Sequence, residues 1–381
     1  MKDRWKVPLA VLSVAGLTAT MVVVLLLHIL PASAQDSCSG VQVNPGDELH
    51  AIVNGDPRDT ATTFCLNAYS DGTSATYNIS ETLRLKDGDR LIGQTGEIVT
   101  RGPATYGVPK VMIRPSGSPD KIIAPIGKDN EIQWVDIAGG VGKTTTDGKP
   151  LRGTGAGITA SSADGGLLIR YVVIHDNDAA GILNAKGRIL NSEFYDNTQN
   201  PDFLGFNASA VKGIIEFEAA YNYVHNEQGN GLWCDVGCKN DSVRANGFWA
   251  HHNLTVDNGR SGIRYESAPN NLASGVHASE PTALIEENEV HGNSYGARRG
   301  GISVLDAQNA LIRANVFGVK TIADVEYRAN AAKPGAVKVS DSGGSSRTDL
   351  WNVHIVDNVL NGEEIRGCEL PDVVVYCANN G

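Results

Sequence analysis

The sequence predicts an all-β solenoid, in which the chain winds into coils of a parallel β-helix behind an N-terminal cap. Three segments, Gly231–Asp235, Gly262–Glu266 and Gly301–Leu305, begin with glycine and an aliphatic residue and then alternate. An asparagine-containing turn precedes each segment, at Asn226, Asn258 and Asn293, and no helical pattern lies between them. The 43 glycines and the few Phe and Met residues are typical of a turn-rich β-protein. Because coils stack equivalent positions, residues distant in sequence are expected to form rows on one face.

The N-terminal 34 residues have the pattern of a secretory signal peptide. Three basic residues precede the apolar stretch from Val7 to Leu30, and the small-residue segment Pro31–Ala34 follows it. The stretch also approaches the roughly 20 residues that span a bilayer, so a membrane anchor over residues 7–30 is the alternative. Pro31 breaks a helix just before the small residues and favours cleavage. We expect an exported chain with a signal over 1–34, a cap and first strands over 35–100, and the solenoid over 101–381.

The charge of the chain limits its partners. The net charge is −11, and removal of residues 1–34 makes it −13, because three basic residues and one acidic residue leave. An acidic surface without a Lys/Arg cluster argues against nucleic acid and against an anionic membrane. A polysaccharide or cell-surface glycan remains compatible, although a strongly anionic polymer would need a local basic patch.

The six cysteines all follow the predicted signal, and an even number in an exported chain indicates disulfides. Proximity in sequence suggests one pair near the start, one in the middle and one near the end: Cys38–Cys65, Cys234–Cys238 and Cys368–Cys377. Six cysteines allow about 15 connectivities. A zinc site is the weaker alternative, because the spacings do not repeat as C-x2-C pairs.

The first hundred residues are predicted to close the open end of the solenoid, which would otherwise expose apolar core and strand edges. A short helix is expected around Glu48–Val53. Strands are expected at Thr63–Leu66, Tyr77–Leu85, Arg90–Gly93, Val111–Arg114, Lys121–Ile123 and Ile132–Val135. The segment Gly139–Gly155 lacks the spacing of a phosphate-binding loop and is predicted to be a surface loop.

From Gly166 the repeats become regular, and an asparagine recurs in similar settings. These residues are Asn191, Asn222, Asn253, Asn288, Asn315 and Asn358. Stacked asparagine amides can hydrogen-bond along the coil axis, so we expect a structural role. Unequal gaps place extra residues in loops at Gln199–Phe206, Pro269–Pro281 and Val319–Lys333, which are expected to form walls beside one face.

His175, His225 and His291 occupy similar turn positions. A row of histidines can bind a metal. Turn residues with satisfied side chains are the favoured interpretation.

Strand alternation predicts the candidate site. With Leu232 and Cys234 pointing into the coil, Trp233 and Asp235 point outward, and the same phase turns Arg264 and Glu266 outward. The predicted outer file consists, coil by coil, of Lys212, Trp233 with Asp235, Arg264 with Glu266, Ser303 and Lys338.

Two carboxyl groups on neighbouring strands, about 4.8 Å apart, suit the chemistry of a glycoside hydrolase. Asp235 is assigned as nucleophile and Glu266 as acid/base, although the two roles can be exchanged. Lys212 is included in the catalytic set. Trp233 is expected to offer a flat face to a sugar, with Arg264, Ser303 and Lys338 as further binding residues. The spacing favours retention of configuration.

Two other interpretations of the same file stay open. Outward acidic and basic residues on a sheet often form ion pairs that aid solubility and block edge pairing. Alternatively, Lys212 or Arg264 is the base of a polysaccharide lyase, while Asp235 and Glu266 hold Ca²⁺ through their oxygens. We expect no cofactor, and Ca²⁺ is considered only under the lyase alternative.

The run from Asn222 to Asn226, Gly231–Asp235 and Gly262–Ser267 resembles the right-handed parallel β-helix repeat proteins of the pectate-lyase-like superfamily, in particular secreted bacterial members. The similarity covers residues 166–365. It implies a single-stranded right-handed β-helix that acts on or binds a polysaccharide. The paired-aspartate motif of polygalacturonases and the calcium-site pattern of pectate lyases are absent, and both absences count against those two activities. Non-catalytic glycan binding is the third alternative.

Overall fold

The computed structural model describes residues 38–160, 166–205, 207–239, 247–266, 281–294, 300–306, 308–318, 321–322, 325–326, 336–340, 350–370 and 375–381. The chain divides into two units, Met1–Ser37 and Cys38–Gly381, and the second is described here. The predicted signal or anchor and most of the predicted loops Pro269–Pro281 and Val319–Lys333 lie outside the described residues. Within the described ranges, no helix has the length and apolar character needed to cross a membrane.

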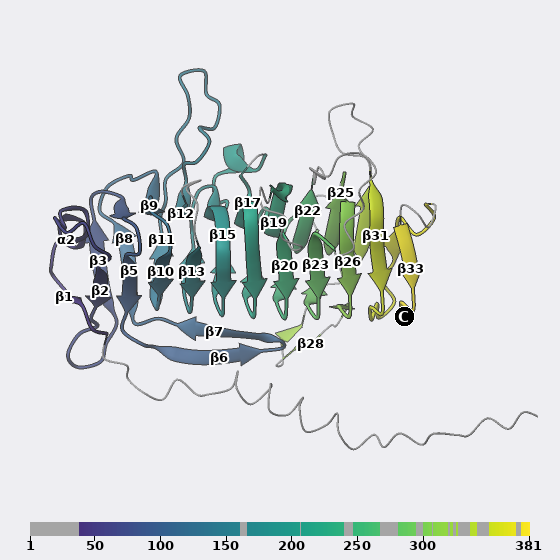
Figure 1. Ribbon diagram of the computed structural model, residues 1–381, viewed down its shortest axis with the longest axis horizontal. Coiled ribbons are helices and arrows are strands. Elements are labelled where there is room, and N and C mark those ends of the chain that lie inside the picture. Colours follow the sequence, from purple (N-terminus) through teal and green to yellow (C-terminus); the bar gives the residue numbers. More distant parts are fainter. Residues whose placement is uncertain are drawn as a thin grey trace, which may run out of the picture. The chain divides into compact units, whose positions relative to one another are not determined.

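The second unit is the predicted parallel β-helix, in which successive coils stack their strands side by side along one axis (Figure 1). Each complete coil contributes a strand to three faces, which we number in chain order. Face 1 contains β4 (Leu83–Leu85), β9 (Lys121–Pro125), β12 (Ala156–Thr159), the first parts of β15 (Ala180–Leu190), β17 (Ser209–Ala220) and β19 (Asn230–Lys239), then β22 (Ile263–Glu266), β25 (Ile302–Leu305), β30 (Val337–Ser340) and β32 (Ile365–Arg366).

Face 2 follows at once, because β15 and β17 continue round a bulge from face 1. Its strands are β1 (Val41–Val43), β2 (Thr63–Leu66), β5 (Arg90–Gly93), β10 (Asn130–Gln133), β13 (Leu167–Arg170), the second parts of β15 and β17, β20 (Phe248–His251), β23 (Ala283–Glu286), β26 (Gln308–Arg313), β31 (Trp351–Val356) and β33 (Val375–Ala378).

Face 3 is a separate parallel sheet. It contains β3 (Ala75–Ile79), β8 (Val111–Pro115), β11 (Val135–Ala138), β14 (Val173–His175), β16 (Glu193–Tyr195), β18 (Tyr223–His225), β21 (Leu254–Val256), β24 (Glu289–His291) and β27 (Val316–Phe317). The remaining elements are α2 (Leu49–Asn54), the antiparallel pair β6 (Glu97–Arg101) and β7 (Ala104–Val108), the short helix η1 (Pro201–Phe203), and β28 (Thr321–Ile322) with β29 (Val325–Glu326).

Alternation along each strand fills the lumen of the coil with apolar side chains. On face 1, Val211, Leu232, Ile263, Ile302 and Val337 are in register on successive strands and have no exposed surface. Burying one such side chain contributes about 1.5 to 3 kcal/mol. One continuous core therefore runs through the stacked coils and fixes the phase in which the intervening residues point outward.

The first asparagine ladder joins seven coils. Four of its members are fully buried: Asn222, Asn253, Asn288 and Asn315. Between neighbouring coils, the backbone N–H and the Nδ2 of the earlier asparagine both donate to the Oδ1 of the later one. The ladder ends at Asn380. Asn191, which the repeat pattern included, is not a member: Ser192 occupies the ladder position, and Asn191 takes the preceding turn position at φ 50°.

A second ladder, at the turn after face 3, contains one acidic residue. Asn177, Asn197, Asn258 and Asn293 hold equivalent buried positions, and Glu227 lies between Asn197 and Asn258. The repeat pattern aligned Asn226 with Asn258 and Asn293, but the equivalent residue is Glu227. Asn226 is the left-handed turn residue just before it, at φ 54°. Asn197 donates to Oε1 of Glu227 at 2.7 Å, while Oε2 is buried without a hydrogen-bond partner.

Burial raises the pKa of Glu227 well above its ordinary value of 4.5, and the charge of Asp196 adds to the effect. The folded state therefore retains a proton that the unfolded chain releases. This contribution to stability is fully present below pH 4.5 and is lost as pH rises through the raised pKa. In Glu227→Gln, we expect a higher unfolding free energy at pH 8 and a flatter dependence on pH, measured by urea denaturation between pH 4.5 and 9. The exposed control Glu97→Gln should follow the wild type; parallel curves for Glu227→Gln and wild type would contradict the assignment.

The N-terminal end is capped as the sequence predicts. Leu49 and Val53 of α2 pack into the core, and the Cys38–Cys65 disulfide ties the first residues to β2. The other two disulfides join Cys234 to Cys238 and Cys368 to Cys377, the pairs that proximity suggested. Strands β1, β2, β4 and β5 already belong to the large sheet, so the coil begins before residue 101. The β6–β7 hairpin lies along face 3, where Tyr106 packs on Tyr223 (Figure 1).

Candidate functional site

The residues predicted to form one outer file do lie in one register on face 1. Lys212 is opposite Trp233, Trp233 opposite Arg264, Arg264 opposite Ser303, and Ser303 opposite Lys338. Their neighbours Leu232 and Ile263 point into the core, so the file faces outward. The exposure differs from the prediction of a solvent-exposed row. Lys212, Trp233, Arg264 and Ser303 are only 3–5% exposed, and Lys338 alone is half-buried.

Trp233 lies at the centre of the file and is covered by cations. The Lys212 Nζ is 4.0 Å from the centroid of the indole ring, and the Arg264 guanidinium carbon is 5.0 Å from it. Both contacts are within the range of cation–π interactions, which strengthen when water is removed. The prediction that Trp233 offers an open face to a sugar is therefore wrong. Its ring contacts Lys212 of the preceding coil and Arg264 of the following coil.

Lys212 and Asp235 form an ion pair, with 2.9 Å between Nζ and Oδ2. The Lys212 side chain is 4% exposed and that of Asp235 is 13% exposed, so the carboxylate keeps the greater access to solvent. Burial lowers the pKa of Lys212, and the charge of Arg264 adds to this, whereas Asp235 and Glu266 act in the opposite direction. The net effect is a lowered pKa, which increases the fraction of the neutral amine, the form that accepts a proton.

Glu266 is held by two donors on the same oxygen. Oε2 accepts from the Arg264 guanidinium at 2.7 Å and from the Trp233 indole N–H at 3.0 Å. Both partners stabilise a carboxylate, because they can only donate. The register that puts Cys234 opposite Tyr265 brings the next residues, Asp235 and Glu266, into neighbouring coils.

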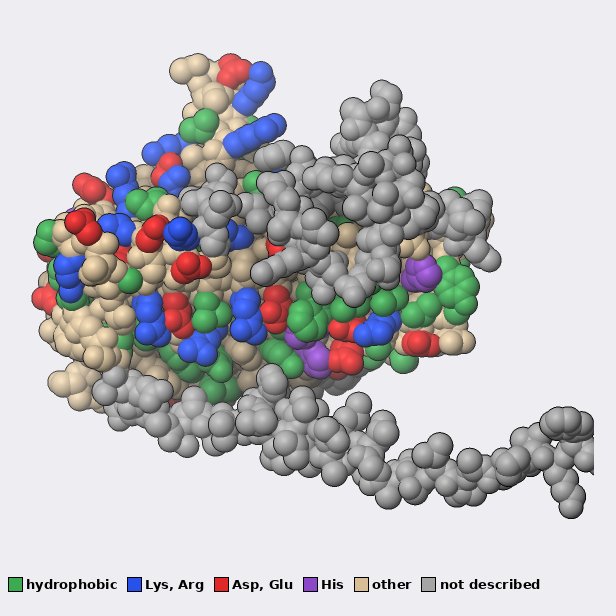
Figure 2. Space-filling model, in the orientation of Figure 1, with side chains coloured by type: hydrophobic (Ala, Val, Ile, Leu, Met, Phe, Trp, Pro, Cys, Tyr) green, Lys and Arg blue, Asp and Glu red, His purple; other side chains and the backbone are tan. Residues whose placement is uncertain are grey.

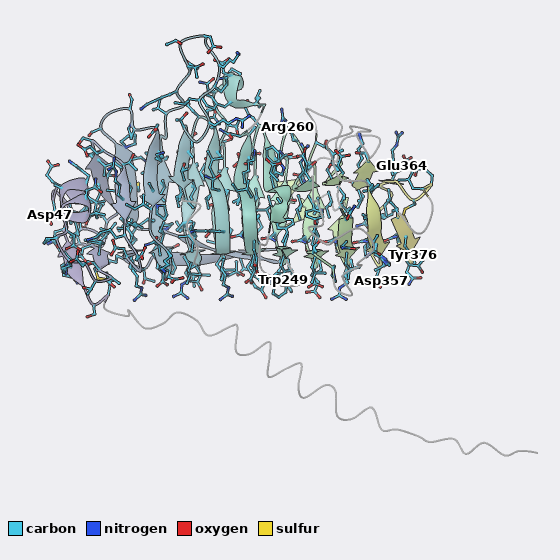
Figure 3. All side chains as sticks on the ribbon, turned by 45° about the horizontal axis from the view of Figure 1, so that its top comes forward. Asp47, Trp249, Arg260, Asp357, Glu364 and Tyr376 are labelled. Atoms are coloured by element: carbon cyan, nitrogen blue, oxygen red, sulfur yellow. A yellow bond between two sulfur atoms is a disulfide. The ribbon has the colours of Figure 1, made fainter. Side chains whose placement is uncertain are left out.

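Arg260 is a member of this environment that the repeat pattern missed. Its Nη1 donates to the backbone oxygen of Gly205 at 3.2 Å, and burial and the charge of Arg264 lower its pKa, against the influence of Glu266. Figure 3 shows Arg260 at the edge of the molecule opposite Trp249. Arg260 comes from the turn before β22, outside the alternating strand, so strand periodicity gave no signal for it.

The donor set does not fit the calcium site considered for Asp235 and Glu266. Ca²⁺ takes six to eight oxygen ligands. Here each carboxylate already accepts from a cationic side chain, and no cluster of three or more His, Cys, Asp or Glu residues suited to a metal is found in the part of the chain that the structure describes.

The histidines of face 3 also form no metal site. His175, Tyr195 and His225 stack with ring centroids 4.6 and 5.2 Å apart, so a tyrosine separates the two imidazoles. Val256 lies between His225 and His291 in the register. Each of the three histidines also has a carboxylate partner. The described residues therefore give each of these histidines a carboxylate partner and no shared metal site.

Face 2 shows what an ordinary solvated file looks like in the same chain. Arg188 pairs with Glu218 at 2.9 Å and Arg313 with Glu286 at 2.7 Å, and the arginine side chains are 60% and 48% exposed. Figure 2 shows such acidic and basic side chains alternating along the visible face. Exposed pairs of this kind contribute little to stability. The pairs of face 1 differ because their arginine and lysine partners are 5% exposed or less.

Insertions flank face 1 where the chain turns onto it from face 3. One is the loop between β11 and β12, and another is the loop that contains η1. These two loops pack together. The Phe203 ring lies so close to Gly142 that a Cβ added to this glycine would be 2.4 Å from the ring. The contact between Arg260 and Gly205 continues this wall towards the file. The described part of the predicted insertion Gln199–Phe206, residues 199–205, thus lies beside the site.

Comparisons with solved structures find distant similarities. No family model matches the sequence, and no curated protein matches it. The A-module of the Azotobacter vinelandii mannuronan C-5 epimerase AlgE4 is 16% identical, with 87% of this chain and 89% of that chain covered and a TM-score of 0.47. The AlgE6 A-module is 13% identical, with 87% of each chain covered and a TM-score of 0.44. The Aspergillus niger pectin methylesterase is 11% identical, with 91% and 87% covered and a TM-score of 0.39.

Proposed function

We propose that this protein acts on a uronate-containing polysaccharide at the outer file of face 1, with Lys212 as the base. The observation that supports this is the register of cations around Trp233, with Lys212 in one coil and Arg264 two strands further along. Arg260 and Lys338 add two more positive charges, against the two carboxylates of Asp235 and Glu266. The site is therefore locally basic in a chain of net charge −11, which suits an anionic sugar.

The chemistry follows from the neutral form of Lys212. Its amine removes the proton from the ring carbon next to the uronate carboxylate, and the electron pair moves into that carboxylate. The positive charges of Arg264 and Arg260 stabilise the dianion that forms. The pair then returns to form a carbon–carbon double bond, the glycosidic oxygen leaves, and the Lys212 ammonium returns the proton to it. The products are an unsaturated sugar end and a new reducing end.

Hydrolysis by paired carboxylates is the second candidate. It is supported by the positions of Asp235 and Glu266 in neighbouring coils of the same outer face, since strand spacing is about 4.8 Å and a retaining glycosidase separates its carboxyl groups by about 5 to 5.5 Å. Its difficulty is the general acid. A hydrolase needs a general acid, and Oε2 of Glu266, the residue assigned to that role, already accepts from Arg264 and from the Trp233 indole N–H.

One experiment separates the candidates. The protein from residue 35 onward is incubated with polygalacturonate, polymannuronate and neutral glucans, and each reaction is followed for reducing ends and for ultraviolet absorbance of unsaturated ends. Lyase action gives both signals on a polyuronate. Hydrolysis gives reducing ends alone, and binding without turnover gives neither signal but retains the polymer in a pull-down. No signal and no binding on any polymer would refute the proposed function.

Export is part of the proposal. The segment before Gln35 has the order of charges, apolar residues and small residues of a secretory signal. The three disulfides fit an oxidising compartment. An extracellular protein would meet a polysaccharide or cell-surface glycan there.

A further inference from the structure

Strand β19 contains a bulge at the candidate site, among the middle coils of the solenoid (Figure 1). Cys234 pairs with Gly213 of β17, and the next pairing joins Lys239 to Ile215. A step of two residues along β17 is therefore matched by a step of five along β19. On the other side, the described pairing of β19 with β22 ends at Cys234. The bulge thus begins at Asp235, the acidic residue of the site.

A disulfide closes this bulge at its base. Cys234 and Cys238 are bonded, with 5.5 Å between their Cα atoms, and both belong to the buried apolar core. Cys234 is paired with the strands on either side of it, whereas Cys238 adopts the left-handed backbone conformation at φ 45°. That conformation is unfavourable for a residue with a Cβ, so the bond holds a turn that the backbone alone disfavours. Asp235 lies inside the closed ring.

The two carboxylates of the site are positioned in different ways. Glu266 lies in the regular part of β22, and its Oε2 accepts from Arg264 and from Trp233. Asp235 follows the last residue of β19 that pairs with β22, so strand register does not fix its position. Its Oδ2 nevertheless lies 2.9 Å from the Nζ of Lys212. A bulge can aim a side chain in this way when its own backbone is restrained.

We propose that the Cys234–Cys238 disulfide is a positioning device, which holds the Asp235 carboxylate against Lys212. The ring restrains Asp235 through its backbone, since this residue directly follows Cys234. Opening the ring should release the bulge and separate the two charges, while β22 and its contacts stay as they are. The catalytic consequence rests on the proposed role of Lys212 as base, whereas the ion pair itself does not depend on that role.

The titration of Lys212 reports whether the ion pair is intact. Burial lowers the pKa of Lys212 most, Asp235 and then Glu266 raise it, and Arg264 lowers it. Loss of the Asp235 contact removes the larger of the two raising influences, so the pKa should fall further. The neutral amine then forms at lower pH. The rising limb of kcat should move to lower pH with it.

The test opens the ring with the double variant Cys234→Ala/Cys238→Ala. The matched control, Cys368→Ala/Cys377→Ala, removes another short disulfide, between residues that do not belong to the file. Lys212 is titrated in each protein by NMR of carbon-13-labelled lysine, with its signal identified from its loss in Lys212→Met. We expect the pKa of Lys212 to be lower by about 1 or more in the ring-opened variant, the scale of a lost opposite charge. The control should titrate as the wild type does.

Asp235→Asn identifies the path of the effect. Added to the ring-opened variant, it should lower the pKa of Lys212 no further, because both changes remove the same contact. The rate on a polyuronate supplies a second readout. Its rising limb should move to lower pH by the same amount in Asp235→Asn and in the ring-opened variant, whereas a general loss of stability would reduce kcat without moving the limb.

Cys238→Ala alone is the second variant, because it opens the ring and leaves the Cys234 side chain in the core. A wild-type titration of Lys212 in a folded ring-opened variant would overturn the positioning role, even with polyuronate turnover intact. Failure of both variants to fold would overturn it too, since the disulfide would then serve the fold as a whole. A ring-dependent titration in a protein that turns over no polyuronate would refute the proposed function and leave the positioning role standing.

Discussion

Replacing Lys212 with methionine is expected to lower kcat on a polyuronate by about 10² to 10⁴-fold, the usual contribution of a positioned acid or base. Methionine keeps an apolar side chain of similar length and removes the amine, which lies 4.0 Å from the centroid of the Trp233 ring. Arginine keeps the positive charge but does not release its proton near neutral pH, so Lys212→Arg should be equally inactive. Rates of ultraviolet product formation measure both variants, and Lys128→Met is the exposed control.

The pH profile distinguishes a base from a residue that merely holds the site together. The neutral amine is the active form, so kcat should rise with pH through the lowered pKa of Lys212. The charge of Asp235 raises that pKa towards the ammonium form. In Asp235→Asn this influence is gone, and the rising limb should move to lower pH. A limb that stays in place in Asp235→Asn, or full activity in Lys212→Arg, would remove Lys212 from the role of base.

Asn288→Ala is expected to reduce the unfolding free energy by about 3 to 5 kcal/mol, the range of a broken buried polar network. The Nδ2 of Asn288 lies within 3.0 Å of the oxygens of Ala250 and Glu286 and of Oδ1 of Asn315, which share its two N–H groups. Oδ1 of Asn288 accepts twice from Asn253. Alanine removes these hydrogen bonds from buried partners and opens a cavity at the turn between face 2 and face 3. Urea denaturation followed by circular dichroism measures the loss.

The matched control is Asn44→Ala, which removes an exposed amide with one side-chain hydrogen bond, from Asn67. It should change stability by about 0.5 kcal/mol or less. If Asn288→Ala and Asn44→Ala unfold at similar urea concentrations, the ladder adds nothing to the cohesion of the coils. The interpretation of the recurring asparagines as structural would then fail.

The fold was predictable because the same sequence pattern recurs in each coil of a solenoid. Each coil carries the same signals: alternating strands, a left-handed turn residue and an inward asparagine. The errors are single-residue displacements at Asn191 and Asn226. In both, an asparagine occupies the left-handed turn position, which it tolerates as well as the ladder position. The true ladder residues, Ser192 and Glu227, are not asparagine, so residue type alone pointed to the wrong neighbour.

The outer file was likewise predictable in membership. Period-2 alternation decides which side chains point out of the lumen. The glycine–aliphatic start that recurs in each coil decides which of them stack, so Lys212, Trp233, Arg264, Ser303 and Lys338 follow from local sequence. Arg260 could not be predicted in this way, because it lies in the turn before β22, where side chains do not alternate.

By itself, the sequence determined the parallel β-helix, its capped start, the cysteine pairs by proximity and the row of outward residues, since all of these depend on local periodicity or short separations. Only the tertiary structure decided that the row is buried, that cations cover Trp233, and that Asp235 and Glu266 are each held by a cationic partner. Burial and pairing depend on side chains that meet from different coils and on the packing around them. No pattern within one repeat encodes these contacts between coils. The contacts favour a lysine base over paired carboxylates in the interpretation of the site.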